Sequence, residues 1–249
     1  MPRPYKAILF DMGYTLVTFD PPVLEIVQRA LAQLGVERQR EQIVEADRAV
    51  WGPYYANAGQ EVFPATPEYD AQVQRGLSSQ ILNHLGVDPH CVDEYRAAMD
   101  AIFRGERAVQ LYPDTLSTLD ALAEQKYRLG IISNWSWNLR QWVRDVGLDG
   151  RFEVVWASAY AGCNKPHPGI FHQVLLQLEL EPADALYVGD SYDHDVVGAQ
   201  GVGMDVVWVN RASGLDDDPW MSRAGSDDPA VSTIAQLSDL LSLVGTDDD

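Results

Sequence analysis

Residues 7–15 read AILFDMGYT, an unbroken run of four apolar residues that ends at an aspartate. The same arrangement returns at residues 186–195, LYVGDSYDHD, where a short apolar run ends in a glycine and a group of aspartates. Three further apolar runs have similar length, at 129–132, 154–157 and 206–209. Runs that are continuous rather than alternating indicate strands buried on both faces, as in a parallel sheet covered by helices on each side.

Amphipathic segments separate the later runs along the chain. Residues 113–125 place Leu116, Leu119 and Leu122 at helical spacing, and residues 170–180 have the same periodicity. These segments are long enough to act as crossover helices between parallel strands. We therefore predict an α/β fold with a doubly wound, Rossmann-like parallel sheet.

The stretch between about Thr18 and Val109 breaks this alternation, because it contains nothing strand-like. Four amphipathic helices are expected there instead, at 23–34, 40–50, 69–85 and 92–103. The loop between the second and third helices is expected to be rich in aromatic residues and proline, with Tyr54, Tyr55, Phe63, Pro64 and Pro67. The simplest interpretation is a helical bundle, residues 18–109, inserted into an α/β core formed by residues 1–17 and 110–249.

The charge of the chain excludes some classes of partner. Its 249 residues carry 18 Lys and Arg against 37 Asp and Glu, a net charge of −19. Binding of nucleic acid or of an anionic membrane through bulk electrostatics is therefore not expected. No apolar stretch approaches the roughly 18 residues of a membrane span, and the first apolar run is too short for a signal peptide. We expect a cytoplasmic protein whose acidic runs, 216–218 and 247–249, are solvated.

The two cysteines add no site of their own. Cys91 and Cys163 fit neither a disulfide framework nor a metal-binding spacing, so they are expected to be ordinary reduced thiols.

Polar residues follow the apolar runs, at the edge of the sheet where sites of this fold class lie. Asp11 follows the first run and Asp190 the fourth, while Ser133 and Lys165 follow the second and third. A carboxylate at a strand end can act as a nucleophile and form an aspartyl phosphate. Its attack on a phosphate dianion requires that negative charge be neutralised, and Mg²⁺ bound by Asp11 and Asp190 suits this role. Lys165 adds a second positive charge, and Ser133 adds a hydroxyl donor to the phosphoryl oxygens.

Four segments in this order resemble the motifs of the haloacid dehalogenase superfamily of hydrolases. They are FDMGYTL at 10–16, ISN at 132–134, KPHPGIF at 165–171 and VGDSYDHDVVGA at 188–199. The resemblance spans the whole chain, because the helical stretch between the first two motifs resembles the four-helix cap of that family. In the family this cap largely determines substrate specificity and closes over the site as a lid.

The resemblance also implies roles for individual residues. Asp11 is implied as the nucleophile, held by Ser133 and Lys165, which also bind the phosphoryl group. The implied Mg²⁺ site consists of Asp11, the backbone carbonyl of Gly13, the carboxylate of Asp190 and, through an outer contact, Asp195. Asn134 is implied in cofactor binding, and Thr15 in support of the loop.

One position departs from the family pattern. Phosphatases of the superfamily carry a second Asp two residues after the nucleophile, where it protonates the leaving group, and this chain has Gly13 there, followed by Tyr14 where glycine is usual. Loss of a positioned acid typically lowers a rate by about 10² to 10⁴-fold. Three explanations stay open: a leaving group that needs no proton, a replacement acid from Tyr14, His194 or the cap, or a protein that binds without efficient turnover.

The leading hypothesis is a Mg²⁺-dependent hydrolase of small phosphate esters or anhydrides, with a small phosphorylated metabolite as its substrate. The first alternative is a metal-independent 2-haloacid dehalogenase, which the retained Asp190 and Asp195 argue against. The second is a catalytically weak protein that binds a phosphate ligand. The sequence identifies neither the substrate nor the oligomeric state.

Overall fold

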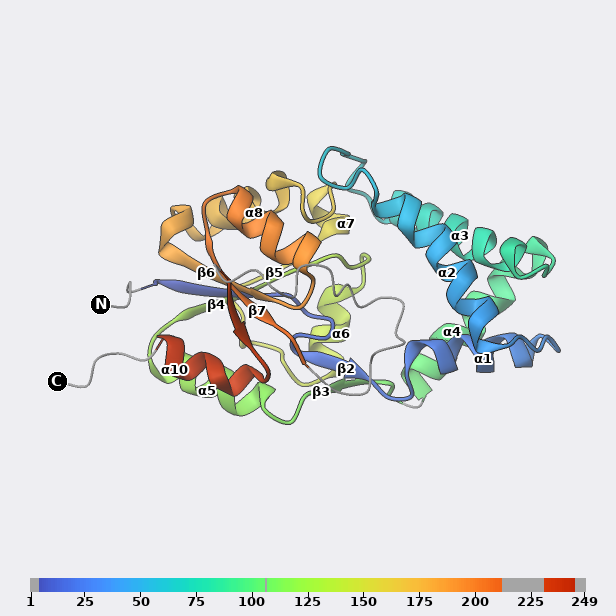
Figure 1. Cartoon of the computed structure of the whole chain (residues 1–249), viewed down its shortest axis with the longest axis horizontal. Coiled ribbons are helices and arrows are strands. Elements are labelled where there is room, and N and C mark those ends of the chain that lie inside the picture. Colours follow the sequence, from blue (N-terminus) through green and yellow to red (C-terminus); the bar gives the residue numbers. More distant parts are fainter. Residues whose placement is uncertain (1–4, 106, 212–230, 245–249) are drawn as a thin grey trace.

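A six-stranded parallel sheet forms the centre of the molecule, with helices on both faces (Figure 1). The structure is a computed structural model that describes residues 5–105, 107–211 and 231–244. The strands occur in the order β5-β4-β1-β6-β7-β8, with bounds β1 Ala7–Phe10, β4 Arg128–Ser133, β5 Val154–Ala157, β6 Ala185–Gly189, β7 Asp205–Val209 and β8 Ser232–Ile234. This confirms the predicted α/β fold with a parallel sheet. The strand β1 lies between β4 and β6, next to the point where the strand order reverses.

Both faces of β1 are buried, which explains why its sequence does not alternate. Ile8 and Phe10 belong to the hydrophobic cluster beneath α5 (Thr115–Glu124), α6 (Leu139–Asp145) and α10 (Leu240–Val244). Ala7 and Leu9 belong to the cluster on the other face, with α8 (Pro168–Leu178) and α9 (Val197–Gly201). All four side chains are fully shielded from solvent. The short helix α7 (Ser158–Ala161) follows β5.

Four helices at one end of the molecule form a separate layer (Figure 1). They are α1 Val23–Gln33, α2 Arg40–Tyr55, α3 Pro67–His84 and α4 Val92–Gly105. Their apolar faces pack into a hydrophobic cluster of their own, which includes Ile26, Leu31, Ile43, Leu82 and Tyr95. We refer to residues 23–105 as the helical layer.

The expectation that no strand occurs near the two ends of this stretch was wrong. Val17–Phe19 (β2) and Val109–Leu111 (β3) form a two-stranded antiparallel sheet that joins the helical layer to the core. Each strand has only three residues and is stabilised by a partner about 90 residues away in sequence, so neither gives a local signal. The strand β8 was also not predicted, and the acidic runs 216–218 and 247–249 lie outside the described residues.

The end of α2 differs most from its expected position. Tyr54 and Tyr55 form the last turn of α2 rather than part of a loop. The helix α6, which follows β4, begins at Leu139, with Asn138 before it. The side chains of Trp135 and Ser136 both donate to Oδ1 of Asn138, at 3.1 and 2.8 Å, and these bonds stabilise a turn in place of a helix start.

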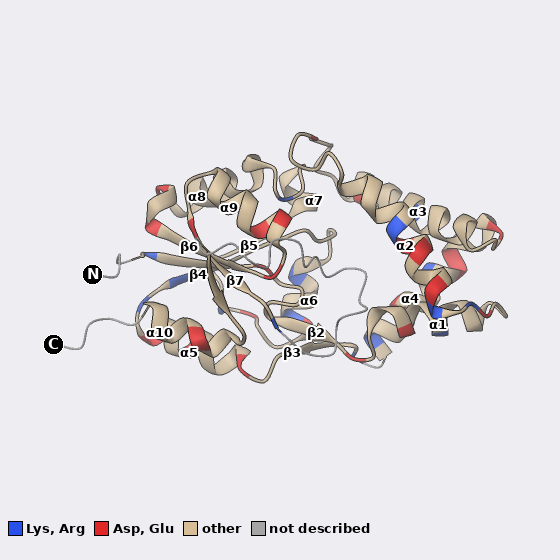
Figure 2. Cartoon of the chain, in the orientation of Figure 1, with Lys and Arg blue, Asp and Glu red and all other residues tan. Residues whose placement is uncertain are grey.

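Short turns complete the description. One turn of π-helix covers Tyr192–Val196, and 3₁₀ turns cover Pro89–Cys91, Pro182–Asp184 and Leu237–Asp239. Lys and Arg are scattered over several elements among Asp and Glu (Figure 2). Within the described ranges, no helix is long and apolar enough to cross a lipid bilayer.

Candidate active site

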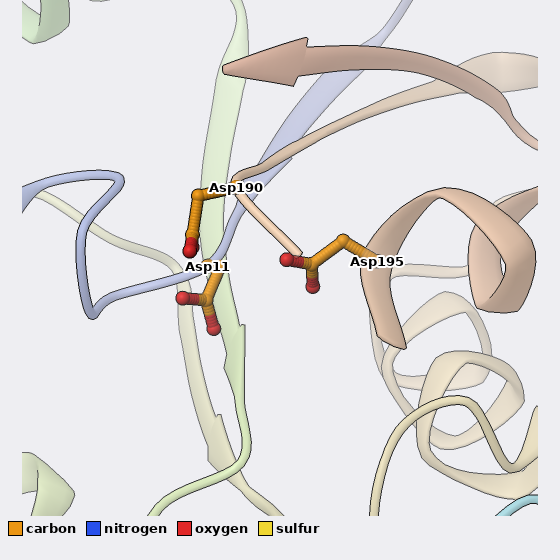
Figure 3. Close-up of side chains that lie close together, drawn as sticks. All are labelled: Asp11, Asp190 and Asp195. Atoms are coloured by element: carbon orange, nitrogen blue, oxygen red, sulfur yellow. The ribbon is translucent and has the colours of Figure 1, made fainter. Parts of the chain in front are cut away.

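Three carboxylates meet at the carboxyl edge of the sheet. Asp11 directly follows β1, Asp190 directly follows β6, and Asp195 lies in the π-helical turn. One oxygen from each lies within 4.8 Å of the others, and Figure 3 shows the three side chains converging. The backbone N–H of Asp11 donates to the carbonyl of Val188 at 2.9 Å, which brings the ends of β1 and β6 to the same height. The parallel pairing therefore places Asp11 beside Asp190.

Lys165 lies between two of these carboxylates. Its Nζ donates to Oδ1 of Asp11 and to Oδ1 of Asp195, both at 2.6 Å, and to the hydroxyl of Tyr187 at 3.0 Å. The residue is only 2% exposed. Burial alone lowers the pKa of the Lys165 ammonium, but the charges of Asp11 and Asp195 outweigh this effect and raise the pKa above its usual value. Lys165 is therefore a fixed positive charge in the site.

Tyr187 was not singled out in the sequence, because it lies inside an apolar strand. Its hydroxyl contacts Oδ1 of Asp195 at 3.0 Å and the carbonyl of Ile132 at 2.8 Å, in addition to Lys165. The Tyr187 hydroxyl therefore helps to hold the ion pair between Lys165 and Asp195 in place.

Ser133 and Asn134 come from the end of β4. Ser133 is buried, and its hydroxyl opposes the rise in the pKa of the Asp11 carboxyl. The amide of Asn134 donates to the carbonyl of Lys165 at 3.1 Å and accepts from the N–H of Lys165 at 2.7 Å. Asn134 thus fixes the backbone that carries the lysine, and its expected role in cofactor binding stays a prediction.

The three carboxylates can carry more negative charge than Lys165 neutralises. If all three carboxylates are ionised, Lys165 leaves two negative charges uncompensated among these four buried side chains. Burial and the charges of Asp11 and Asp195 raise the pKa of Asp190 well above its usual value. Burial also raises the pKa of Asp11, and the ammonium of Lys165 only partly opposes this rise. A divalent cation would remove the repulsion, and carboxylate oxygens are the ligands that Mg²⁺ prefers, so the donor set fits this ion.

The loop after Asp11 turns tightly and exposes a backbone carbonyl. The N–H of Thr15 donates to the carbonyl of Gly13 at 2.6 Å, and this carbonyl retains a second lone pair. Between them Tyr14 has φ of +52°, in the left-handed region that favours glycine. Its ring is 5% exposed and packs edge-on against Phe19, with centroids 5.2 Å apart. Thr15 donates from its hydroxyl to Oδ1 of Asp190 at 3.1 Å.

The space beside Gly13 is bordered by an aromatic ring. A Cβ atom built on Gly13 would lie 3.7 Å from Cζ3 of Trp135, in ordinary van der Waals contact. The indole of Trp135 thus borders the position from which an acidic side chain would project. Trp135 was not among the expected site residues, and the aromatic pair in the segment SNWSW at 133–137 is the signal that could have identified it.

A cleft of about 1350 Å³ separates the carboxylates from the helical layer. Contacts across it join the two parts. Nδ2 of Asn164 donates to the hydroxyl of Tyr54 at 3.3 Å, and the N–H of Trp137 donates to Oδ2 of Asp70 at 2.9 Å. The N–H of Phe63 donates to the carbonyl of Gly162 at 2.7 Å.

His194 faces this cleft from the π-helical turn. Its Nδ1 lies 3.2 Å from Oγ of Ser191, and its ring lies 4.9 Å from the ring of Tyr55, centroid to centroid. Burial lowers the pKa of His194 below its usual value. The imidazole is therefore neutral at pH 7.

Comparison with known proteins agrees with this geometry. Residues 8–209 match the sequence model of the haloacid dehalogenase-like hydrolases. The chain is 28% identical over 218 residues to a glyceraldehyde 3-phosphate phosphatase of Methanopyrus kandleri, which covers 86% of this chain and 88% of that protein.

Solved structures show the same similarity. A HAD phosphatase from Thermococcus onnurineus has 25% identity and a TM-score of 0.63, covering 96% of this chain and 98% of its own. An L-2-haloacid dehalogenase from Xanthobacter autotrophicus has 25% identity and a TM-score of 0.71, with the same coverage of 96% and 98%. Both a phosphatase and a dehalogenase therefore share this fold with the chain.

Proposed function

The chain belongs to the haloacid dehalogenase-like hydrolases, and from that premise we propose that it is a Mg²⁺-dependent phosphatase acting through an aspartyl phosphate on Asp11. The observation that carries the proposal is the buried group of three carboxylates around a single lysine. Such a group is strongly unfavourable without further positive charge. Removal of this repulsion by a divalent ion would also prepare the site for an anionic substrate.

The metal would be held by the carboxylates of Asp11 and Asp190 and the carbonyl of Gly13, with Asp195 as an outer ligand. Once bound, Mg²⁺ supplies positive charge to the oxygens of the transferring phosphoryl group. The geometry of Thr15 supports this assignment, because its hydroxyl fixes one oxygen of Asp190 and leaves the other available.

The remaining steps belong to the side chains. Lys165 and Ser133 orient the Asp11 carboxylate for attack on phosphorus. As the Asp11–phosphorus bond forms, the bond from phosphorus to the leaving-group oxygen breaks, and the ammonium of Lys165 stabilises the charge on the phosphoryl oxygens. Water then hydrolyses the acyl phosphate and restores Asp11.

We also propose that residues 18–109 form a cap domain that excludes water during transfer, over a core of residues 1–17 and 110–249. Support comes from the separate hydrophobic cluster of the helical layer and from its contacts across the cleft. A small phosphorylated metabolite is the proposed substrate, as in the named activity of the relative from Methanopyrus kandleri. The expected cytoplasmic location stays a prediction.

The test is hydrolysis of 4-nitrophenyl phosphate by the purified protein. We expect turnover with Mg²⁺, none with excess EDTA, and none in the variant Asp11→Asn. A wild-type protein without Mg²⁺-dependent turnover contradicts the proposal.

A dehalogenase activity is the second candidate, favoured by one observation: no acid occupies position 13. Displacement of halide at carbon needs no proton on the leaving group. Release of halide from a 2-haloacid in the presence of EDTA would support this candidate in place of the phosphatase.

A further inference from the structure

The site lacks the acid expected beside the nucleophile, so the source of the leaving-group proton has to be sought elsewhere. Gly13 has no side chain, and the indole of Trp135 borders its position. Tyr14 also borders the cleft, but its ring packs edge-on against Phe19 and the residue is only 5% exposed. His194, the other candidate from the core, contacts Ser191 through Nδ1 and packs its ring against Tyr55. The helical layer forms the opposite side of the cleft.

Tyr55 is the last residue of α2, at the side of the helical layer that borders the cleft. It lines the same cleft as Asp11, Lys165 and Asp190. The negative charge of Asp11 contributes, after burial and Tyr54, to raising the pKa of the Tyr55 phenol. The ring of Tyr55 also contacts that of His194, the residue directly before Asp195.

The ring of Tyr55 is held firmly by other aromatic rings. It stacks on Trp51 with centroids 5.8 Å apart and an interplanar angle of 18°. It also contacts the ring of Tyr54 edge-on at 4.9 Å and the ring of His194 at 4.9 Å. These three ring contacts define where the Tyr55 ring lies in the cleft.

The hydroxyl of Tyr55, in contrast, has no hydrogen-bond partner in the part of the chain that the structure describes. The neighbouring Tyr54 uses its hydroxyl to accept a bond from Asn164, and Tyr187 makes three contacts. Tyr55 is only partly buried and lines the cleft that the carboxylates also line. A donor hydroxyl on the wall of this cleft suits an oxygen of a bound substrate.

We propose that Tyr55 is the proton donor to the leaving-group oxygen and replaces the acid that is absent at Gly13. This inference rests on the proposed phosphatase function. As the bond from phosphorus to the leaving oxygen breaks, the phenolic proton of Tyr55 moves to that oxygen, and the product leaves as an alcohol. The water that then attacks the phosphorus of the aspartyl phosphate returns a proton to the phenolate, so the cycle ends with Tyr55 neutral.

The dependence of rate on the leaving group tests this role. 4-Nitrophenolate leaves without protonation, so Tyr55→Phe should change kcat/KM for 4-nitrophenyl phosphate by less than about threefold. For alkyl phosphates such as glycerol phosphate, the same variant should lose about 10² to 10⁴-fold. The slope of log kcat/KM against leaving-group basicity should become steeper in the variant.

Tyr54→Phe is the matched control, because it removes the neighbouring hydroxyl, which bonds Asn164 across the cleft. We expect it to slow aryl and alkyl phosphates by the same factor. A fluorotyrosine incorporated at position 55 keeps the ring and hydroxyl while strengthening the acid, and it should change the pH profile for alkyl phosphates only.

The outcomes separate the two proposals. If the wild-type protein shows no Mg²⁺-dependent turnover that Asp11→Asn abolishes, the phosphatase function itself is wrong. If turnover is present but Tyr55→Phe slows both substrate classes alike, or neither, the proton comes from another group and the assignment of Tyr55 is overturned.

Discussion

Replacement of Asp190 by Asn should stabilise the metal-free protein at neutral pH. The substitution removes one of three mutually repelling carboxylates and keeps the size of the side chain. The Asn oxygen can still accept the bond that Thr15 donates to Oδ1 at 3.1 Å. The variant therefore changes charge with little change in packing.

The size of the effect follows from proton linkage. The pKa of Asp190 is raised in the folded protein, so this group holds its proton to higher pH when folded than when unfolded. The free energy of unfolding of the wild type then falls as pH rises from about 4, where an unfolded Asp titrates, through the folded pKa. Each unit of raised pKa costs about 1.4 kcal/mol, so at pH 7 the loss is at most about 4 kcal/mol. Asp190→Asn avoids this loss.

Urea denaturation between pH 4.5 and pH 8, with EDTA or with Mg²⁺, measures the effect. In EDTA the variant should be more stable than the wild type at pH 7, and the difference should vanish toward pH 4. Saturating Mg²⁺ should shrink the difference, because an ion at a hundredfold excess over Kd stabilises the wild type by about 2.7 kcal/mol. The variant should gain much less.

Asp93→Asn is the matched control for charge removal. Asp93 is exposed and bonds Arg75, which lowers the pKa of the carboxyl, so this variant should lose stability at neutral pH and show no altered response to Mg²⁺. Two results would refute the reasoning. One is equal stability of Asp190→Asn and wild type in EDTA at pH 7, and the other is a gain in stability from Mg²⁺ that is as large in Asp190→Asn as in the wild type.

Three further substitutions test other parts of the site. Gly13→Asp should accelerate alkyl phosphates more than aryl phosphates, with the larger gain on the Tyr55→Phe background; equal gains on both backgrounds would argue against Tyr55 as the proton source. Lys165→Met leaves two buried carboxylates without their shared counter-charge, so a denaturation midpoint should report a loss of about 3 to 5 kcal/mol, and an unchanged midpoint would contradict the ion-pair geometry. At Gly162 φ is +70°, and a Cβ atom there would lie 2.7 Å from the carbonyl oxygen of Phe63. Gly162→Ala should therefore weaken the contact with the helical layer and raise KM. An unchanged KM would show that the contact is dispensable.

The sequence predicts the parts of this protein that depend on local patterns. Continuous apolar runs identify five of the strands, and Asp11 and Asp190 follow from the rule that parallel strands end at a common edge. The strands β2 and β3 escape this reasoning, because each is stabilised by pairing with a segment distant in sequence.

The residues next to the reacting groups could not be predicted from the sequence for a similar reason. Tyr187 lies in an apolar strand, and its hydroxyl acquires a role only when Lys165 folds against it. Trp135 and Tyr55 line the same cleft as the nucleophile, but the periodicity of the sequence does not place their segments relative to one another. Contacts between side chains of distant segments could therefore be identified only from the structure.

The most direct test of the account is detection of the covalent intermediate on Asp11. The protein is mixed with substrate and Mg²⁺, quenched in acid during turnover and treated with borohydride, which reduces an acyl phosphate to an alcohol. Peptide mass spectrometry should then find homoserine at position 11, and EDTA should abolish it. An unmodified Asp11 under turnover, or modification of a different residue, would contradict the central claim.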